Sequence, residues 1–89
     1  VALLARALGA AAVPHFVNGL SDEHSVVRAR SATSLMALGD DAKPHLAKLA
    51  ALLADMGQLV RRSAARALVT LAPADSADAA LARKLLESR

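Results

Sequence analysis

Apolar residues recur along this chain at the three- and four-residue spacing of amphipathic helices. Residues 25–38 and 58–71 each hold one apolar stripe. The stripes consist of Val27, Ala32, Leu35 and Leu38 in the first segment and of Val60, Ala65, Leu68 and Leu71 in the second. The opposite faces hold Arg30, Thr33, Ser34 and Ala37, and Ser63, Arg66, Ala67 and Thr70. This pattern predicts two helices that each bury one face.

Short breaks divide the whole chain into six predicted helices, and no strand-like alternation appears. The helices are expected at about residues 1–8, 11–20, 25–38, 41–54, 58–71 and 76–88. Gly9 and Gly39 suit the left-handed position that follows a helix. Pro14 and Pro44 fall in first turns, where a missing N–H is harmless. The fold class is therefore expected to be all-α.

Two of these segments contain an internal sequence repeat. Residues 27–39 and 60–72 share a pattern that opens on Val-Arg, continues with small residues and ends on leucines. A partial third copy, residues 2–9, lies upstream at nearly the same spacing. A fixed period of this length is typical of stacked helical repeats, in which each helix pair buries its remaining apolar face against its neighbours.

The repeated unit is a helix–turn–helix with an early proline, an Asp in the turn, and a Val-Arg pair opening the second helix. The two copies carry Pro14, Asp22, Val27 and Arg28, and Pro44, Asp55, Val60 and Arg61. This pattern resembles the HEAT repeat of the armadillo-like family, in a short-period form. The ankyrin repeat has a similar period, but the Thr, Leu and Gly-rich turn of that motif are absent.

The HEAT resemblance covers essentially the whole chain and implies an α-solenoid of antiparallel helix pairs. Its units would be the second helix of a preceding repeat at 1–9, full repeats at 10–39 and 40–72, and the first helix of a following repeat at 73–89. Because the chain begins inside a helical pattern and lacks an initiator Met, we expect it to be part of a longer protein.

The turn carboxylates are expected to be structural. Asp22 and Asp55 each precede an arginine, Arg28 and Arg61, by six residues. A turn Asp can accept hydrogen bonds from N–H groups at the start of the next helix, and the arginine can reach a turn Asp of its own or the adjacent repeat. The remaining turn carboxylates, which helix capping and the helix dipole would explain, are Glu23, Asp40, Asp41, Asp75 and Asp78.

No group of residues predicts catalysis, a cofactor or a bound metal. His15 and His45 occupy equivalent positions in neighbouring units, and helices about 8–10 Å apart hold them too far apart to share one ion. His24 can bond locally beside Asp22 and Glu23. The serines at 31, 34 and 63 lack a suitably spaced His and a glycine-rich elbow. No Gly-rich phosphate loop is present. We therefore expect that the chain is not an enzyme.

Composition limits the classes of partner that this chain is expected to bind. The net charge is +3, acidic residues are interspersed with basic ones, and Phe16 is the single aromatic residue, so nucleic acid is the less favoured partner. No apolar run reaches the roughly 20 residues that a membrane span needs. Without cysteine, the compartment stays undecided.

The resemblance implies that the second helix of each unit lines a concave face, and this predicts one continuous candidate wall. The candidate wall consists of Arg30, Thr33, Ser34, Arg62, Ser63, Arg66 and Thr70. It is mildly basic, carries short hydroxyl side chains, and would suit an acidic peptide, a helix or a neighbouring subunit. We expect a protein–protein interaction scaffold within a larger assembly.

Two alternative functions stay open. A HEAT-like accessory enzyme domain of the phycobilin-lyase type would need a large concave pocket for a tetrapyrrole. A nucleic-acid-binding HEAT-like domain would use the arginines of the candidate wall and would bind with steep salt dependence.

Overall fold

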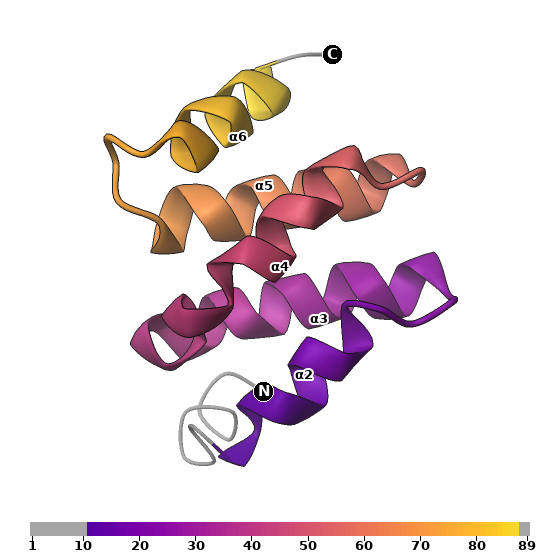
Figure 1. Cartoon of the computed structure of the whole chain (residues 1–89). Coiled ribbons are helices and arrows are strands. Elements are labelled where there is room, and N and C mark those ends of the chain that lie inside the picture. Colours follow the sequence, from indigo (N-terminus) through magenta and orange to yellow (C-terminus); the bar gives the residue numbers. More distant parts are fainter. Residues whose placement is uncertain (1–10, 88–89) are drawn as a thin grey trace.

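Every regular element in residues 11–87, the part of the chain that the computed structural model describes, is helical (Figure 1). The elements are α2 (Val13–Gly19), α3 (Ser25–Leu38), the 3-10 segment η2 (Gly39–His45), α4 (Leu46–Ala51), the 3-10 segment η3 (Leu52–Ala54), α5 (Gln58–Leu71) and α6 (Ala77–Glu87). The all-α prediction is confirmed for these residues. The predicted helix at 1–8, Gly9 and the partial copy at 2–9 lie outside them.

The helix ends follow the signals in the sequence. α3 and α5 begin and end where the apolar pattern predicts. Gly39 follows α3 with φ of 65° and ψ of −126°, a positive-φ conformation that glycine adopts without the steric cost of a side chain. Pro14 lies in the first turn of α2. At the start of α6, the Ser76 hydroxyl accepts a hydrogen bond from the Ala79 N–H at 3.2 Å, a helix cap that replaces a missing backbone acceptor.

The prediction of a single helix at 41–54 is wrong. Residues 39–45 and 52–54 are 3-10 helix, and α4 covers six residues between them. Pro44 explains the first departure, because proline donates no N–H and disfavours the α conformation in the residue before it. Asp40 and Asp41 consequently lie at the start of η2 without capping α4, and Asp40 instead pairs with Lys43 at 2.9 Å.

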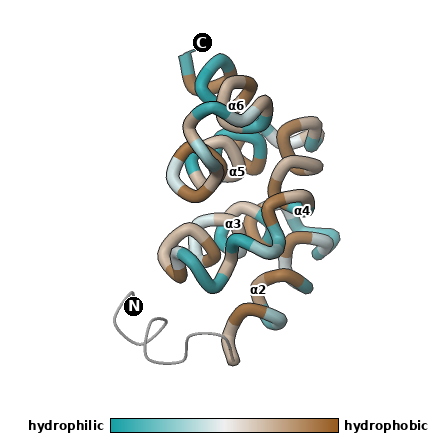
Figure 2. The backbone as a smooth tube through the Cα atoms, turned by 60° about the vertical axis from the view of Figure 1, so that its left-hand side comes forward, coloured by the Kyte–Doolittle hydropathy of each residue, from teal (hydrophilic) through white to brown (hydrophobic). Residues whose placement is uncertain are grey.

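α5 is the central helix of the fold. It packs extensively against α3 on one side and α6 on the other, and α4 crosses α3 and α5 (Figures 1 and 2). α2 packs mainly against α3. The radius of gyration, 12.0 Å, matches the value of about 12 Å expected for a compact globule of this length. The described fold is a compact all-α globule, and the α-solenoid stays a prediction.

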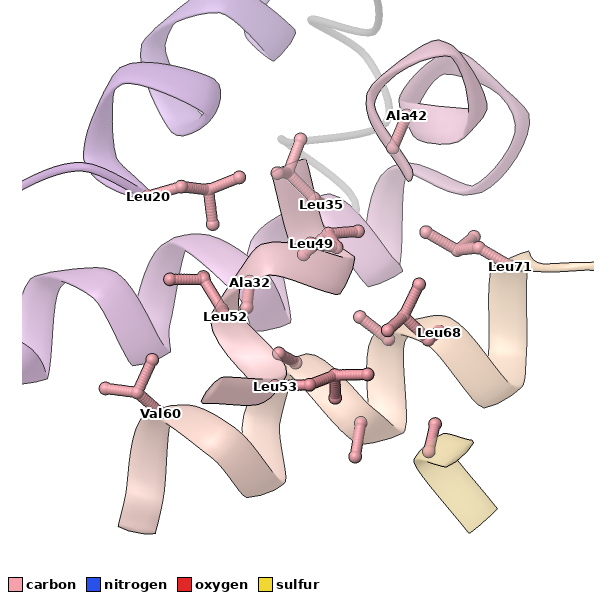
Figure 3. Packing of buried hydrophobic residues seen from close by; sticks show 14 of the residues in the cluster. Leu20, Ala32, Leu35, Ala42, Leu49, Leu52, Leu53, Val60, Leu68 and Leu71 are labelled. Carbon is pink, nitrogen blue, oxygen red and sulfur yellow. The ribbon is translucent and has the colours of Figure 1, made fainter. Parts of the chain in front are cut away.

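The core gathers leucines from α3, α4 and α5. Leu35 of α3, Leu49 of α4 and Leu68 of α5 are fully buried and belong to one cluster (Figure 3). Alanines at helix contacts, among them Ala64 and Ala82, are also fully buried. Their small side chains allow neighbouring helices to approach closely, so the core is built from close backbone packing as much as from large side chains.

Two positions predicted from the apolar stripes are wrong. Ala67 was expected to face outward and is fully buried, because α6 covers a second face of α5. Val27 was expected in the buried stripe and is 38% exposed, whereas its repeat equivalent Val60 is fully buried. The repeated sequence therefore has different surroundings in its two copies.

α2 and α3 meet at a contact that leaves no room for a methyl group. A Cβ at Gly19 would overlap the Oγ of Ser31 and lie 3.0 Å from its Cβ. Ser31 is buried, so its side chain has little space to move away. A glycine near the end of α2 is therefore required by packing.

We expect Gly19→Ala to lower the free energy of unfolding by about 1–3 kcal/mol, because overpacking outweighs the ~0.5–1 kcal/mol gain in helix propensity. Denaturant unfolding measures the change. Adding Ser31→Ala should recover part of the loss by removing the overlapping hydroxyl. Gly57→Ala is the control, since its nearest neighbour would lie 3.4 Å away. A Gly19→Ala protein as stable as the wild type would contradict this packing.

Candidate functional site

Arg28 joins the turn before α3 to the turn before α5. Its Nε donates to Asp55 Oδ1 at 2.9 Å and its Nη2 donates to Asp55 Oδ2 at 3.2 Å. Its Nη1 donates to the Asp22 carbonyl oxygen at 2.8 Å. The Arg28 and Asp55 side chains are only 17% and 11% exposed. This two-bond ion pair, with a third bond to the backbone, fixes both turns in one geometry.

The two turn aspartates make the same local bond. Asp22 Oδ1 accepts from the backbone N–H of His24, and Asp55 Oδ2 accepts from that of Gly57, both at 2.8 Å. His24 and Gly57 are the N-cap residues of α3 and α5. Beyond that bond the two turns differ, because the Asp22 carboxylate meets the His24 ring at 3.0 Å where Asp55 meets Arg28.

Arg61 repeats the carbonyl bond of Arg28 but not its ion pair. Its Nη1 donates to the Asp55 carbonyl oxygen at 2.8 Å, the equivalent of the bond from Arg28 to Asp22, and to the Met56 carbonyl oxygen at 3.0 Å. It forms no ion pair with a described carboxylate. Of the residues predicted to form Asp–Arg pairs, the structure therefore joins Arg28 and Asp55, which lie in adjacent units.

These contacts lower the pKa of both aspartates. The hydrogen bond from Arg28 is the largest cause for Asp55, followed by the Gly57 N–H, and partial burial opposes them. For Asp22 the pKa falls chiefly because the carboxylate accepts the His24 N–H. Each contact stabilises the ionised carboxylate, so ionisation of these groups and folding favour each other.

The candidate wall encloses two adjoining hollows between α3 and α5. The larger, of about 340 Å³, is lined by Ala29, Arg30, Thr33, Ser34, Leu59 and Ser63. The smaller, of about 220 Å³, is lined by Thr33, Met36, Leu59, Arg62, Ser63 and Arg66. The two share Thr33, Leu59 and Ser63. Six of the seven residues of the candidate wall line these hollows, and Thr70 lines neither.

Hydroxyl groups contribute less to this surface than the sequence predicts. Thr33 donates its hydroxyl to the Ala29 carbonyl oxygen at 3.1 Å, and Thr70 donates to that of Arg66 at 2.9 Å. Both bonds stay within one helix. The threonine O–H groups are therefore already used, and the wall's donors toward a ligand are its arginines and the two serines at 34 and 63.

The arginines of the candidate wall have no counter-ions in the described part of the chain. Within residues 11–87, neither Arg30 nor Arg62 nor Arg66 forms an ion pair. Arg30 and Arg66 are exposed and Arg62 is partly so. No described acidic side chain lines either hollow. Three positive charges thus face solvent around one concave surface, which favours negatively charged ligands.

Sequence reasoning missed the apolar part of this site. Leu59 lines both hollows and is 59% exposed, and Val26, its equivalent in the first copy of the repeat, is 50% exposed. The signal lay in the repeat period, which places these two large apolar residues at the same helical position, four residues before Arg30 and Ser63. The predicted wall of basic and hydroxyl side chains therefore also contains an exposed apolar residue, Leu59.

The other candidate residues stay apart. His15 is exposed and its ring lies edge-on to Phe16 at 5.2 Å, while His45 is the N-cap of α4. Among the residues that the structure describes, no group of three or more His, Cys, Asp or Glu side chains could hold a metal ion. No helix in the same region is long and apolar enough to cross a membrane.

Comparisons of this chain with protein-family models, with curated proteins and with solved structures found no match.

Replacing Arg28 with Ala should lower the free energy of unfolding by about 1–3 kcal/mol, because Asp55 is left partly buried without its ion-pair partner. Arg61→Ala should cost less, since it removes only bonds to carbonyl oxygens. Arg30→Ala is the control, with an expected change within about 0.5 kcal/mol. Thermal melts compare the three variants. Equal melting of the Arg28→Ala and Arg30→Ala proteins would overturn the structural role of Arg28.

Acidification should lower the free energy of unfolding, in part because it protonates the Asp55 carboxylate. Its folded pKa lies below the ordinary value of 3.8, so its contribution is complete above pH 3.8 and is lost as pH falls through the folded pKa. Asp55→Asn should therefore be less stable at neutral pH yet lose less stability between about pH 5 and about pH 2. Asp22 titrates in both proteins. Unfolding curves at several pH values test this, and parallel losses would contradict it.

Proposed function

We propose that this chain is a protein–protein interaction scaffold that holds a partner protein on the candidate wall. The observation that carries the proposal is the set of three arginines, without counter-ions among the described residues, around an open hollow with an apolar floor. A net positive, partly apolar concavity complements an acidic partner and accelerates its association. Binding of this kind uses the surface as it stands and requires no reacting group.

The proposal includes a HEAT-like arrangement of the two units. Matching contacts support it: the arginine-to-carbonyl bond and the bond that the N-cap N–H donates to the turn Asp recur in both units with the same lengths. The direct packing of α3 on α5 is also consistent with stacked second helices. In such a stack, side chains at equivalent positions of α3 and α5 face the same partner.

Charge reversal on the candidate wall tests the proposal. We expect Arg30→Glu with Arg66→Glu to leave folding nearly unchanged, because both side chains are exposed and neither forms an ion pair within the described residues. Association with an acidic partner should weaken by about tenfold or more. The control is Lys43→Glu with Lys48→Glu, which reverses two exposed charges in η2 and α4. It also removes the exposed ion pair between Lys43 and Asp40, so melting curves check that this variant stays folded.

Partners are identified by quantitative affinity capture with the wild type and both variants, and affinities are then measured with purified proteins. The proposal requires a protein that the wall variant loses and the control retains. If the control variant loses its partners and the wall variant keeps them, the binding surface lies elsewhere and the proposal is wrong.

A further inference from the structure

The two hollows of the candidate wall share an apolar lining residue. Leu59 lines both of them and leaves 59% of its surface exposed, whereas the leucines of the neighbouring core are buried. Ala29 adds to the floor of the larger hollow, and Met36 to the smaller one. Such an exposed apolar floor within a concave surface gains free energy when an apolar side chain covers it.

Positive charges lie around both hollows that share this floor. Arg30 lines the larger hollow, on the α3 side, and Arg62 and Arg66 line the smaller one, on the α5 side. Since no acidic side chain of the described residues lines either hollow, a carboxylate placed in one of them meets positive charge alone. Arginine binds carboxylates with up to two parallel hydrogen bonds, which gives such a contact a defined direction.

On the basis of the proposed function, we infer that the partner segment is acidic and carries one large apolar side chain between its carboxylates. The apolar side chain packs on Leu59 and fills the larger hollow. Carboxylates on either side of it reach Arg30 in one direction and Arg62 or Arg66 in the other. The arginines select for acidic segments in general, and Leu59 selects among them for those with an apolar residue at the centre.

The surface favours a peptide over a nucleic acid. Single-stranded nucleic acids are held by aromatic side chains that stack on bases and by long basic tracks along the backbone. The chain's single aromatic residue, Phe16, belongs to α2 and does not line the hollows. The hollows are instead floored by aliphatic groups, which match an aliphatic or aromatic amino-acid side chain.

Four labelled probes test the inference by fluorescence anisotropy with the whole chain. The first is a synthetic peptide with a central leucine flanked by glutamates. The second replaces that leucine with serine, and the third replaces the glutamates with glutamines. The fourth is a single-stranded oligonucleotide of similar charge. We expect the first peptide to bind at least about fivefold more tightly than the second or third.

A pair of matched variants assigns the effect to the site. Leu59→Ala should weaken the binding of the first peptide by about fivefold and leave the binding of the serine peptide unchanged, because the substitution removes apolar contact alone. Leu81→Ala on α6 is the control, since Leu81 is 50% exposed and lines neither hollow. Both leucines are exposed, so neither variant opens a core cavity, and melting curves verify folding.

The outcomes separate this inference from the proposed function. If the serine peptide binds as well as the leucine peptide and Leu59→Ala changes nothing, the apolar anchor is wrong while an acidic partner on the candidate wall stands. If no peptide binding responds to Arg30→Glu with Arg66→Glu, both fail. Tighter, strongly salt-dependent binding of the oligonucleotide would overturn the choice of a peptide partner.

Discussion

The position of α3 relative to α5 depends on the ion pair between Arg28 and Asp55. α3 and α5 pack extensively on each other, and both bury alanines, among them Ala32 and Ala64. A guanidinium that holds both carboxylate oxygens and a backbone carbonyl has a single favourable position. This polar contact therefore sets the alignment of the candidate wall, whose two halves lie on different helices.

Much of the fold was predictable because the sequence carries local signals for it. Glycine after α3 and the apolar period fixed the limits of α3 and α5 to the residue. Other features depend on contacts distant in sequence. The burial of Ala67 requires the position of α6, which no local pattern contains. Likewise, Asp55 has an arginine six residues after it and another 27 residues before it, and only the fold makes the earlier one its partner.

The candidate site was predictable in its charges and less so in its chemistry. Arg30, Arg62 and Arg66 were expected on one surface because the HEAT resemblance implies that the second helices of successive units line one face, and they line the two hollows. The threonines looked like donors until their hydroxyls were found bonded within their own helices. Leu59 was missed because, within a single helix, an apolar residue next to a buried stripe looks the same as one that belongs to the stripe, and only the comparison with Val26 across the repeat marks its position.

The 3-10 segments on either side of α4 divide the molecule into parts of unequal local stability. 3-10 hydrogen bonds have poorer geometry than α-helical ones, and α4 itself has six residues. Hydrogen exchange in residues 39–54 should consequently proceed through openings of lower free energy than in α3 and α5, each 14 residues long and joined by Arg28 and Asp55. Amide protons behind the candidate wall would then be the last to exchange, which means that a partner meets a surface already ordered and forfeits little conformational entropy on binding.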